Sequence, residues 1–510
     1  MHRIGFKKIL LFLARFKSGI MILAVFMVGV ILMFYRIDRY PLSMGIYEGI
    51  TGLSAMKVME GESEHITAIW EKPIRKQRGG GAGVASCEFN PLLVCPTSLF
   101  FTLFGQDRHH IILRLTSIIY GLLSILGLYL LARKLFGSMV GLTAAFILAT
   151  STWALTYSRV AVDLSQVVFL SLFCLCLYLV LKPSHSVGFL LLGGVTSLST
   201  YGYVAARIIF PLLVLDMVLS MVVKRGYARS HWQSLILLLA GFWLGLLLQG
   251  AHLPDFFQTN VPTSFGTWHE QALAPFWQGT TENLAALYNR FFREWSWNTA
   301  IVTERGASLD PVTGICFAVG ALWSFVKIKT HGYRLLILWG IAAFLPCVIS
   351  TNAEYRRAIL AAPAVYILAA VGIYRIFSLP ALLIRNRWGT IIKKGGIVAV
   401  VLVIAYLNLD HYFGLYRKAE NDPGNAYAIW REQRARLMKL MDGGKVYTDI
   451  FRSDYGWPQT IEYEARSRGY RDRYILLDSG RAKRKFSADD DAHALYLIRE
   501  GITLKKETVN

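Results

Sequence analysis

Four groups of polar and ionisable residues interrupt this strongly apolar chain, and the first surrounds a carboxylate. In "LSMGIYEGITGLSAMKVMEG", residues 42–61, helical spacing places Glu48, Gly52 and Ala55 on one face, away from an apolar stripe. Small residues beside a carboxylate would let a ligand or a neighbouring backbone approach it. Glu48 could therefore serve as a base, or it could be a solvated acid that the helix macrodipole favours.

The second and third groups combine carboxylates with arginines. In "TYSRVAVDLSQ", Arg159 and Asp163 are four residues apart, a spacing that places both on one face of a helix and would also allow an internal salt bridge. In "NAEYRRAILAAP", Glu354 precedes Arg356 and Arg357 at the start of an expected helix. Adjacent arginines there oppose the macrodipole, so we expect them to bind an anion or to anchor the helix to lipid phosphates.

The fourth group, "YGYVAAR", places Tyr203 and Arg207 in the outer half of another expected helix. Arg207 could bind phosphate, or its side chain could snorkel to the headgroups. Ionisable side chains at the ends of membrane helices are costly enough to be candidates for function.

The elements that must position these groups are membrane helices. Of the 510 residues, 54% are hydrophobic and only 17% are charged. Apolar segments occur at residues 20–35, 111–131, 140–155, 167–181, 208–223, 235–248, 315–326, 335–349, 358–373 and 397–407. A helix needs about 20 such residues to span a bilayer, which several segments reach alone and others reach with their uncharged flanks. We expect an all-α polytopic membrane domain with about eleven transmembrane helices.

The distribution of charge predicts the orientation of these helices. Most of the net charge of +21 belongs to the membrane part, where Lys and Arg gather in alternate short loops. With the N-terminus in the cytoplasm these loops are internal, and Asp216 is the one acid before residue 410 on that side. Residues 37–110, 253–310 and 410–510 are then outside. We expect contacts with membrane lipids and no nucleic-acid partner.

The chain is expected to divide into a transmembrane domain, residues 1–409, and a small extracytoplasmic α/β domain, residues 410–510. The second has a helical pattern in "AYAIWREQRARLMKLM" and strand patterns in "KVYTDI" and "RYILLD". Cys87 and Cys95 share the first external loop and are either a disulfide or two thiols. The chain has no Walker loop, dinucleotide fingerprint or Asn-x-Ser/Thr sequon, and the last absence favours a bacterial source.

Together the four groups describe an outward-facing pocket with carboxylates and phosphate-binding arginines. A polyprenyl phosphate suits such a pocket, with its tail in the bilayer and its head group among the arginines. Transfer of a sugar from this donor is a displacement at the anomeric carbon, with phosphate as a good leaving group that arginine or a metal stabilises. What remains for the protein to supply is a carboxylate base that deprotonates or orients the acceptor.

Five stretches in the same order resemble the membrane-embedded glycosyltransferases of the GT-C fold. The similarity is greatest to the branch of protein O-mannosyltransferase-like and aminoarabinose-transferase-like enzymes. It covers roughly residues 18 to 410 and is carried by "RYPLSMGIYEGITGLSAMKVMEG", "FNPLLVCPTSLFFTLFG", "LRLTSIIYGLLSILGLYLLARKLFG", "YSRVAVD" and "EYRRAILAAP".

The resemblance assigns roles to matching positions. It implies that Glu48 and Asp163 are the catalytic carboxylates. It further implies a set of donor-phosphate ligands, Arg159, Arg356 and Arg357, to which we add Arg207. The acceptor pocket is expected to include Tyr47, Asn90, Tyr203 and Glu354.

The chain also departs from the family pattern. Tyr47 stands where the family usually has Asp, Asn90 replaces a His or Lys, and Leu92 replaces a Pro. Glu88 lies one residue from a position that contributes to a divalent metal site in some relatives. A divalent metal ion is therefore the only cofactor that the resemblance implies.

We expect a polyprenyl-phosphate-dependent glycosyltransferase, transferring a hexosyl or pentosyl group on the outer face of a bacterial cytoplasmic (inner) membrane as part of cell-envelope chemistry. Two alternatives stay open: a transporter or flippase of lipid-linked sugars, and a non-catalytic scaffold of the same fold. The sequence leaves open which sugar is transferred and whether the acceptor is a protein, a lipid or a glycan.

Overall fold

The computed structural model describes most of the apolar helices and shorter parts of the segments between and after them. The described residues are 2–40, 46–61, 91–105, 109–162, 164–182, 186–200, 204–223, 227–248, 281–282, 284–285, 309–348, 358–383, 387–421, 438–439, 446–448, 463–470, 474–476, 495–500 and 503–508. All statements below concern these residues.

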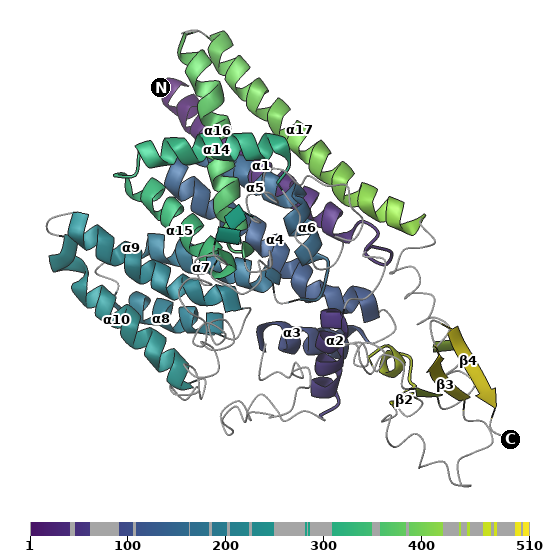
Figure 1. Cartoon of the computed structure of the whole chain (residues 1–510). Coiled ribbons are helices and arrows are strands. Elements are labelled where there is room, and N and C mark those ends of the chain that lie inside the picture. The colour runs from purple at the N-terminus through teal and green to yellow at the C-terminus, as the bar shows by residue number, and fades with distance from the viewer. Residues whose placement is uncertain are drawn as a thin grey trace.

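Helices dominate the described part of the chain (Figure 1). They are α1 (His2–Phe34), α2 (Ile46–Met59), α3 (Pro91–Phe104), α4 (His109–Phe136), α5 (Ser138–Thr150), α6 (Thr152–Ser158), α7 (Leu164–Val180), α8 (Ser186–Ser197), α9 (Ile209–Val223), α10 (Tyr227–Leu248), α14 (Pro311–Val326), α15 (His331–Val348), α16 (Ala361–Leu383) and α17 (Arg387–Glu420). Short 3-10 helices η2 (Leu198–Thr200) and η3 (Val204–Ile208) connect α8 to α9.

Six of these helices are long and apolar enough to cross a membrane, or seven if the bent pair α5 and α6 forms one span. The chain is therefore a multi-pass membrane protein, as the sequence predicted. Helices α7 and α14 and parts of α1 and α8 are shorter apolar helices, and added to the count of seven they would give the expected eleven. That number, and the direction in which the helices cross, stay predictions. The helical spacing around Glu48 is confirmed by α2, and the segment that follows Asn90 forms α3.

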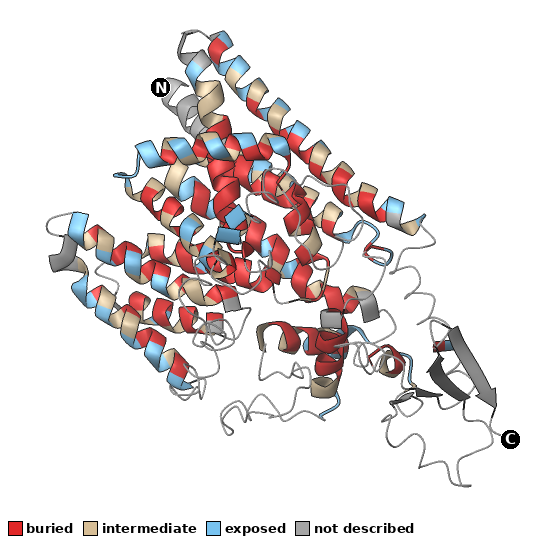
Figure 2. Ribbon diagram, viewed as in Figure 1, coloured by how far each residue is buried: buried red, intermediate tan, exposed pale blue. Residues whose placement is uncertain are grey.

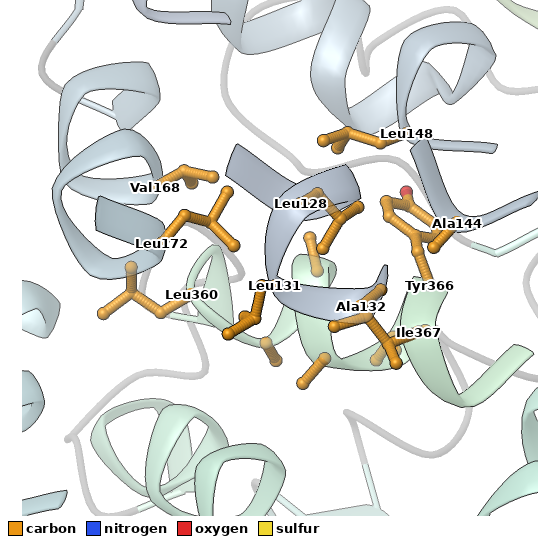
Figure 3. Close-up of a cluster of buried hydrophobic side chains, with 14 of the residues drawn as sticks. Leu128, Leu131, Ala132, Ala144, Leu148, Val168, Leu172, Leu360, Tyr366 and Ile367 are labelled. Atoms are coloured by element: carbon orange, nitrogen blue, oxygen red, sulfur yellow. The ribbon is translucent and has the colours of Figure 1, made fainter. Parts of the chain in front are cut away.

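The centre of the helical part is a core of buried apolar side chains formed by α4, α5, α7 and α16. Figure 3 shows Leu128 and Leu131 of α4 packed among side chains of α5 and α7, with Tyr366 and Ile367 of α16 close by. Figure 2 shows buried residues concentrated on these helices, whereas α17 has a long exposed face. Exposed apolar side chains on such a surface are expected to face lipid.

Two pairs of helices approach each other through glycine. Between α14 and α16, an added Cβ on Gly372 would lie 1.9 Å from the carbonyl oxygen of Cys316, and one on Gly320 would lie 1.8 Å from that of Leu368. Between α8 and α10, an added Cβ on Gly241 would lie 2.0 Å from the carbonyl oxygen of Leu190. Small residues allow membrane helices to pack backbone against backbone.

The span formed by α5 and α6 is broken at Ser151 and bends by 57°. The Ser151 side chain accepts a hydrogen bond from Ala154 N at 3.1 Å, and the side-chain oxygen of Asn408 in α17 accepts one from Thr152 N at 3.2 Å. The Asn408 amide nitrogen in turn donates to Asp310, which caps α14. Backbone groups freed by a break inside a membrane need such partners.

A buried carboxylate on α9 also has partners. Asp216 accepts a hydrogen bond from the Tyr178 hydroxyl at 2.9 Å and lies 2.8 Å from Nε2 of His331, with Arg334 3.7 Å away. The residue that the sequence singled out as the lone acid on the inner side therefore connects α7, α9 and α15.

The C-terminal part contains a four-stranded sheet of order β2-β1-β3-β4. Its strands are β1 (Val446–Thr448), β2 (Tyr474–Leu476), β3 (Leu495–Glu500) and β4 (Thr503–Thr508). Strand β1 pairs in parallel with both β2 and β3, with Val446 opposite Tyr474 and Leu495, while β3 and β4 form an antiparallel hairpin. The two predicted strand patterns coincide with β1 and β2, and helix α17 continues past the expected boundary at residue 409. A separate α/β domain stays a prediction.

The glycine contact between α14 and α16 yields a test of the fold. Gly372→Ala is expected to lower the free energy of unfolding by about 1–3 kcal/mol, because the backbone of Cys316 leaves no room for the methyl group. Gly340→Ala is the matched control, since no atom lies within 4 Å of an added Cβ there. Thermal unfolding in detergent measures both, and equal melting temperatures would contradict the packing.

Candidate active site

Glu48 and Arg114 form a buried ion pair between α2 and α4. Arg114 Nε lies 2.8 Å from Glu48 Oε1 and Arg114 Nη2 lies 3.2 Å from Glu48 Oε2, so the contact is bidentate. The two side chains are only 3% and 2% exposed. A bidentate pair of this kind fixes orientation as well as charge, and it holds α2 onto the central helix α4.

The same carboxylate organises the segment that follows α6. Glu48 Oε1 accepts a hydrogen bond from the backbone nitrogen of Ala161 at 3.1 Å. Ala161 lies two residues before Asp163 in the chain. Glu48 therefore holds the backbone that leads directly to the second predicted catalytic carboxylate.

Two arginines satisfy the carbonyl groups where the chain leaves α1. Arg114 Nη1 donates to the carbonyl of Ile37 at 2.9 Å. Arg159 Nη1 donates to Leu32 at 2.6 Å, and its Nη2 donates to Tyr35 at 2.7 Å and to Tyr40 at 3.1 Å. The last carbonyls of a helix lack partners within it and carry partial negative charge, so cations are stabilising there.

Aromatic residues of α17 complete this region. The guanidinium carbon of Arg159 lies 5.6 Å from the ring centre of Tyr412 and 5.4 Å from that of Phe413, within the range of cation–π attraction. Tyr40 stacks on Tyr416 with ring centres 5.1 Å apart, and its hydroxyl donates to Glu420 at 2.9 Å. The end of α17 thus packs against the chain leaving α1.

The structure brings Glu48 and Arg159 into one buried network, with one difference from the expectation. The spacing predicted Arg159 and Asp163 on one face of a helix, and this is wrong. Helix α6 ends at Ser158, Arg159 is its C-cap, and α7 begins only at Leu164. Arg159 therefore lies in a connection between helices, where its guanidinium turns back to the carbonyls of α1. Arg159 is 0% exposed, and its guanidinium contacts backbone carbonyls rather than solvent.

Arg207, another predicted phosphate ligand, lies half-buried in η3, just before α9. The other predicted site residues lie outside the described part of the chain: Glu88, Asn90, Asp163, Tyr203, Glu354, Arg356, Arg357 and the side chain of Tyr47. Cys87 does too, so the choice between a disulfide with Cys95 and two thiols stays open. Among the described residues there is no group of three or more potential metal ligands. A metal at Glu88 also stays a prediction.

Arg114 was missed by the reasoning from sequence, although a signal for it is present. It lies in "HHIILRLTS", inside a segment assigned as a plain apolar helix. An ionisable residue inside a transmembrane helix is a site candidate by default, and its partner must be sought among opposite charges elsewhere. Applied to this segment, that rule would have paired Arg114 with Glu48 or Asp163.

Comparison with known proteins shows which proteins have a similar sequence or fold. The family model "Dolichyl-phosphate-mannose-protein mannosyltransferase" matches residues 91–249, a range that includes Arg114, Arg159 and Asp163. None of the curated proteins matches the chain.

Solved structures match over almost the whole chain. ArnT from Cupriavidus metallidurans in the apo state superposes with a TM-score of 0.55 at 13% identity, covering 95% of this chain and 93% of ArnT. The same protein bound to undecaprenyl phosphate gives 0.54 at 14% identity, covering 93% and 92%.

The oligosaccharyltransferase AglB from Archaeoglobus fulgidus, in complex with an inhibitory peptide and a dolichol-phosphate, gives a TM-score of 0.54 at 14% identity. The match covers 91% of this chain, which spans 64% of the length of AglB. These likenesses show that the chain has the GT-C fold of membrane-embedded glycosyltransferases.

The ion pair is open to a direct test. Arg114→Met is expected to lower the free energy of unfolding by about 3–5 kcal/mol, because it leaves the Glu48 carboxylate buried without its partner. The double variant Arg114→Met with Glu48→Gln is expected to recover part of this loss, since the new amide is neutral and can still accept from Ala161 N. Thermal unfolding of the purified variants measures both. A double variant less stable than Arg114→Met would contradict the assignment.

Proposed function

We propose that this protein is a glycosyltransferase that moves a sugar from a polyprenyl-phosphate donor to an acceptor on the outer face of the cytoplasmic membrane. The observation that carries the proposal is the likeness, over nine tenths of both chains, to ArnT bound to undecaprenyl phosphate. The mannosyltransferase family match through the segment with Arg114 and Asp163 supports it independently.

The two carboxylates receive different roles. Glu48 is buried and already engaged by Arg114 and by the backbone of Ala161, so we assign it as a positioning residue. Asp163 follows the segment that Glu48 holds, and we assign it as the base that deprotonates or orients the acceptor. With these roles, the reaction does not need an Asp at position 47, where this chain has Tyr47. One reacting carboxylate is sufficient because the phosphate of the donor is already a good leaving group.

The donor phosphate is assigned to Arg356 and Arg357, with Arg207 as a further ligand. Arg159 is bound to backbone carbonyls and buried, so we give it a part in shaping the pocket rather than the first contact with phosphate. Tyr47, Asn90, Tyr203 and Glu354 are proposed to line the acceptor side. Positive charge at the phosphate stabilises the leaving group as the sugar–phosphate bond breaks.

Transfer of labelled sugar from polyprenyl phosphate by the purified protein tests the roles. Asp163→Asn is expected to lower kcat about 10²–10⁴-fold with little change in the KM for the donor, which is the size of effect typical of a lost general base. Arg356→Gln with Arg357→Gln is expected to raise the donor KM instead. Full activity of Asp163→Asn would remove it from the reaction.

Glu48→Gln separates positioning from catalysis in the same assay. The amide can still accept from Ala161 N, so we expect a loss of activity smaller than that of Asp163→Asn, accompanied by a lower melting temperature. Equal losses of activity in both variants, with the melting temperature of Glu48→Gln unchanged, would place Glu48 at the reacting atoms. Assays with and without added Mg²⁺ or Mn²⁺ test the predicted metal separately.

A transporter of lipid-linked sugars is the second candidate, and the broken span at Ser151 is the observation in its favour, since discontinuous helices are common in transporters. The break is filled by Ser151 and Asn408 rather than by a ligand site. Movement of a fluorescent polyprenyl-linked sugar across vesicles, without transfer to any acceptor, would favour this candidate over the transferase.

A further inference from the structure

A short segment near the C-terminus, residues 463–470, packs against helices α2 and α3. Tyr463 is 0% exposed and belongs to a small apolar cluster that also includes Leu53 and Met56 of α2, Phe101 of α3 and Ala161. Its ring stacks on that of Phe101 with centres 6.2 Å apart. Ala161 is the residue whose amide donates to Glu48, so this cluster directly adjoins the candidate site.

The contact with α2 is made through a glycine. A methyl group on Gly52 would lie 2.6 Å from Cε2 and 2.8 Å from Cζ of Tyr463, so the ring lies directly on the helix backbone. Gly52 is one turn along α2 from Glu48, at a spacing of four residues that places both on one face. The small residue predicted to admit a ligand or a neighbouring backbone therefore admits an aromatic ring from the tail.

A second contact orients the segment. Arg466 Nη1 lies 2.9 Å from Glu60 Oε2, just beyond the end of α2, and this pair is largely shielded, with side chains 11% and 22% exposed. Residues 463–467 form a short helix between the parallel strands β1 and β2. Parallel strands need a crossover connection, and this helix belongs to the connection between β1 and β2. Figure 1 shows this short helix between α2 and the strands.

Electrostatics agree with this location. Burial, together with the negative charges of Glu464 and Glu48, raises the pKa of the Tyr463 phenol well above its ordinary value. The ring is therefore neutral throughout the physiological range. A neutral ring one helical turn from Glu48 adds no charge beside the buried ion pair, and the attraction within such a pair is stronger where the surroundings are less polar than water.

We propose that Tyr463 is a positioning residue of the site, through which the C-terminal segment 463–470 holds α2 and keeps the Glu48–Arg114 pair and the 159–162 connection in place. The C-terminal segment 463–470 then contributes to the site that the membrane helices form. The consequence for activity rests on the proposed transferase function, whereas the docking itself does not.

Gly52→Ala and Tyr463→Ala test the docking in the full-length protein. Gly52→Ala leaves the ring no room on α2, and Tyr463→Ala removes the ring. Hydrogen exchange of peptides covering α2 and residues 159–162 is expected to accelerate at least tenfold in both variants, while exchange in the central helix α16 stays unchanged. Gly340→Ala, whose added methyl group meets open space, is the matched control and should exchange like the wild type.

A double-mutant cycle shows whether both changes act through one contact. In the Tyr463→Ala background, Gly52→Ala is expected to have no further effect, because the ring that it displaces is gone. Tyr463→Phe keeps the ring and is expected to restore slow exchange. Additive effects of the two substitutions, or faster exchange in α16 as well, would overturn the docking and indicate general destabilisation.

Transfer activity decides whether the docked segment serves the site. Tyr463→Ala is expected to lower kcat at least tenfold, with the donor KM nearly unchanged and activity restored in Tyr463→Phe. Faster exchange of residues 159–162 with unchanged kcat would overturn the positioning role. If the wild type transfers no sugar at all, the proposed function fails, and exchange at residues 159–162 still decides whether Tyr463 holds the Glu48–Arg114 pair in place.

Discussion

The constraint on which this structure depends is the end of its first helix. Where the chain leaves α1, the carbonyls of Leu32, Tyr35 and Ile37 accept hydrogen bonds from arginine side chains, as carbonyls at a helix end need partners from outside the helix. Two guanidinium groups meet this need, and both are nearly inaccessible to solvent. Each buried guanidinium must then be compensated in turn, because an unpaired polar or charged group in such surroundings is costly.

That compensation organises the surroundings. Arg114 is neutralised by Glu48, which places α2 against α4 and holds the backbone before Asp163. Arg159 lies over the aromatic rings of α17, which places the last membrane helix against the first. A single requirement for hydrogen-bond partners therefore links segments from the beginning, middle and end of the membrane part. The proposed base, Asp163, follows this network directly in the sequence.

The sequence predicted the features that depend on composition and periodicity. Most apolar segments became helices, the helical spacing around Glu48 became α2, and β1 and β2 coincide with strand patterns. Features that depend on distant partners were not predictable in this way. Arg114 was passed over because a single charge barely changes the hydropathy of its helix. The break at Ser151 has no Pro or Gly beside it and depends on Asn408, more than 250 residues away.

The spacing of Arg159 and Asp163 shows a related limit. Residues four apart share one face only if a helix continues between them. Here α6 ends at Ser158, and the side chain of its C-cap Arg159 donates to the carbonyls of Leu32 and Tyr35. Gly52 shows the reverse case. The sequence correctly suggested a close approach at this position, but the approaching group, Tyr463, comes from the far end of the chain and could be recognised only in three dimensions.

The contact between Tyr40 and Glu420 has a consequence for the folding of the protein during its synthesis. The two residues are separated by 380 positions, so at about 5–20 residues per second a ribosome needs roughly 20 to 80 s to supply the second after the first. During that interval the first helix is already in the membrane while the aromatic rings that will cover Arg159 do not yet exist. The beginning of the chain must wait, in an incompletely satisfied state, for its end.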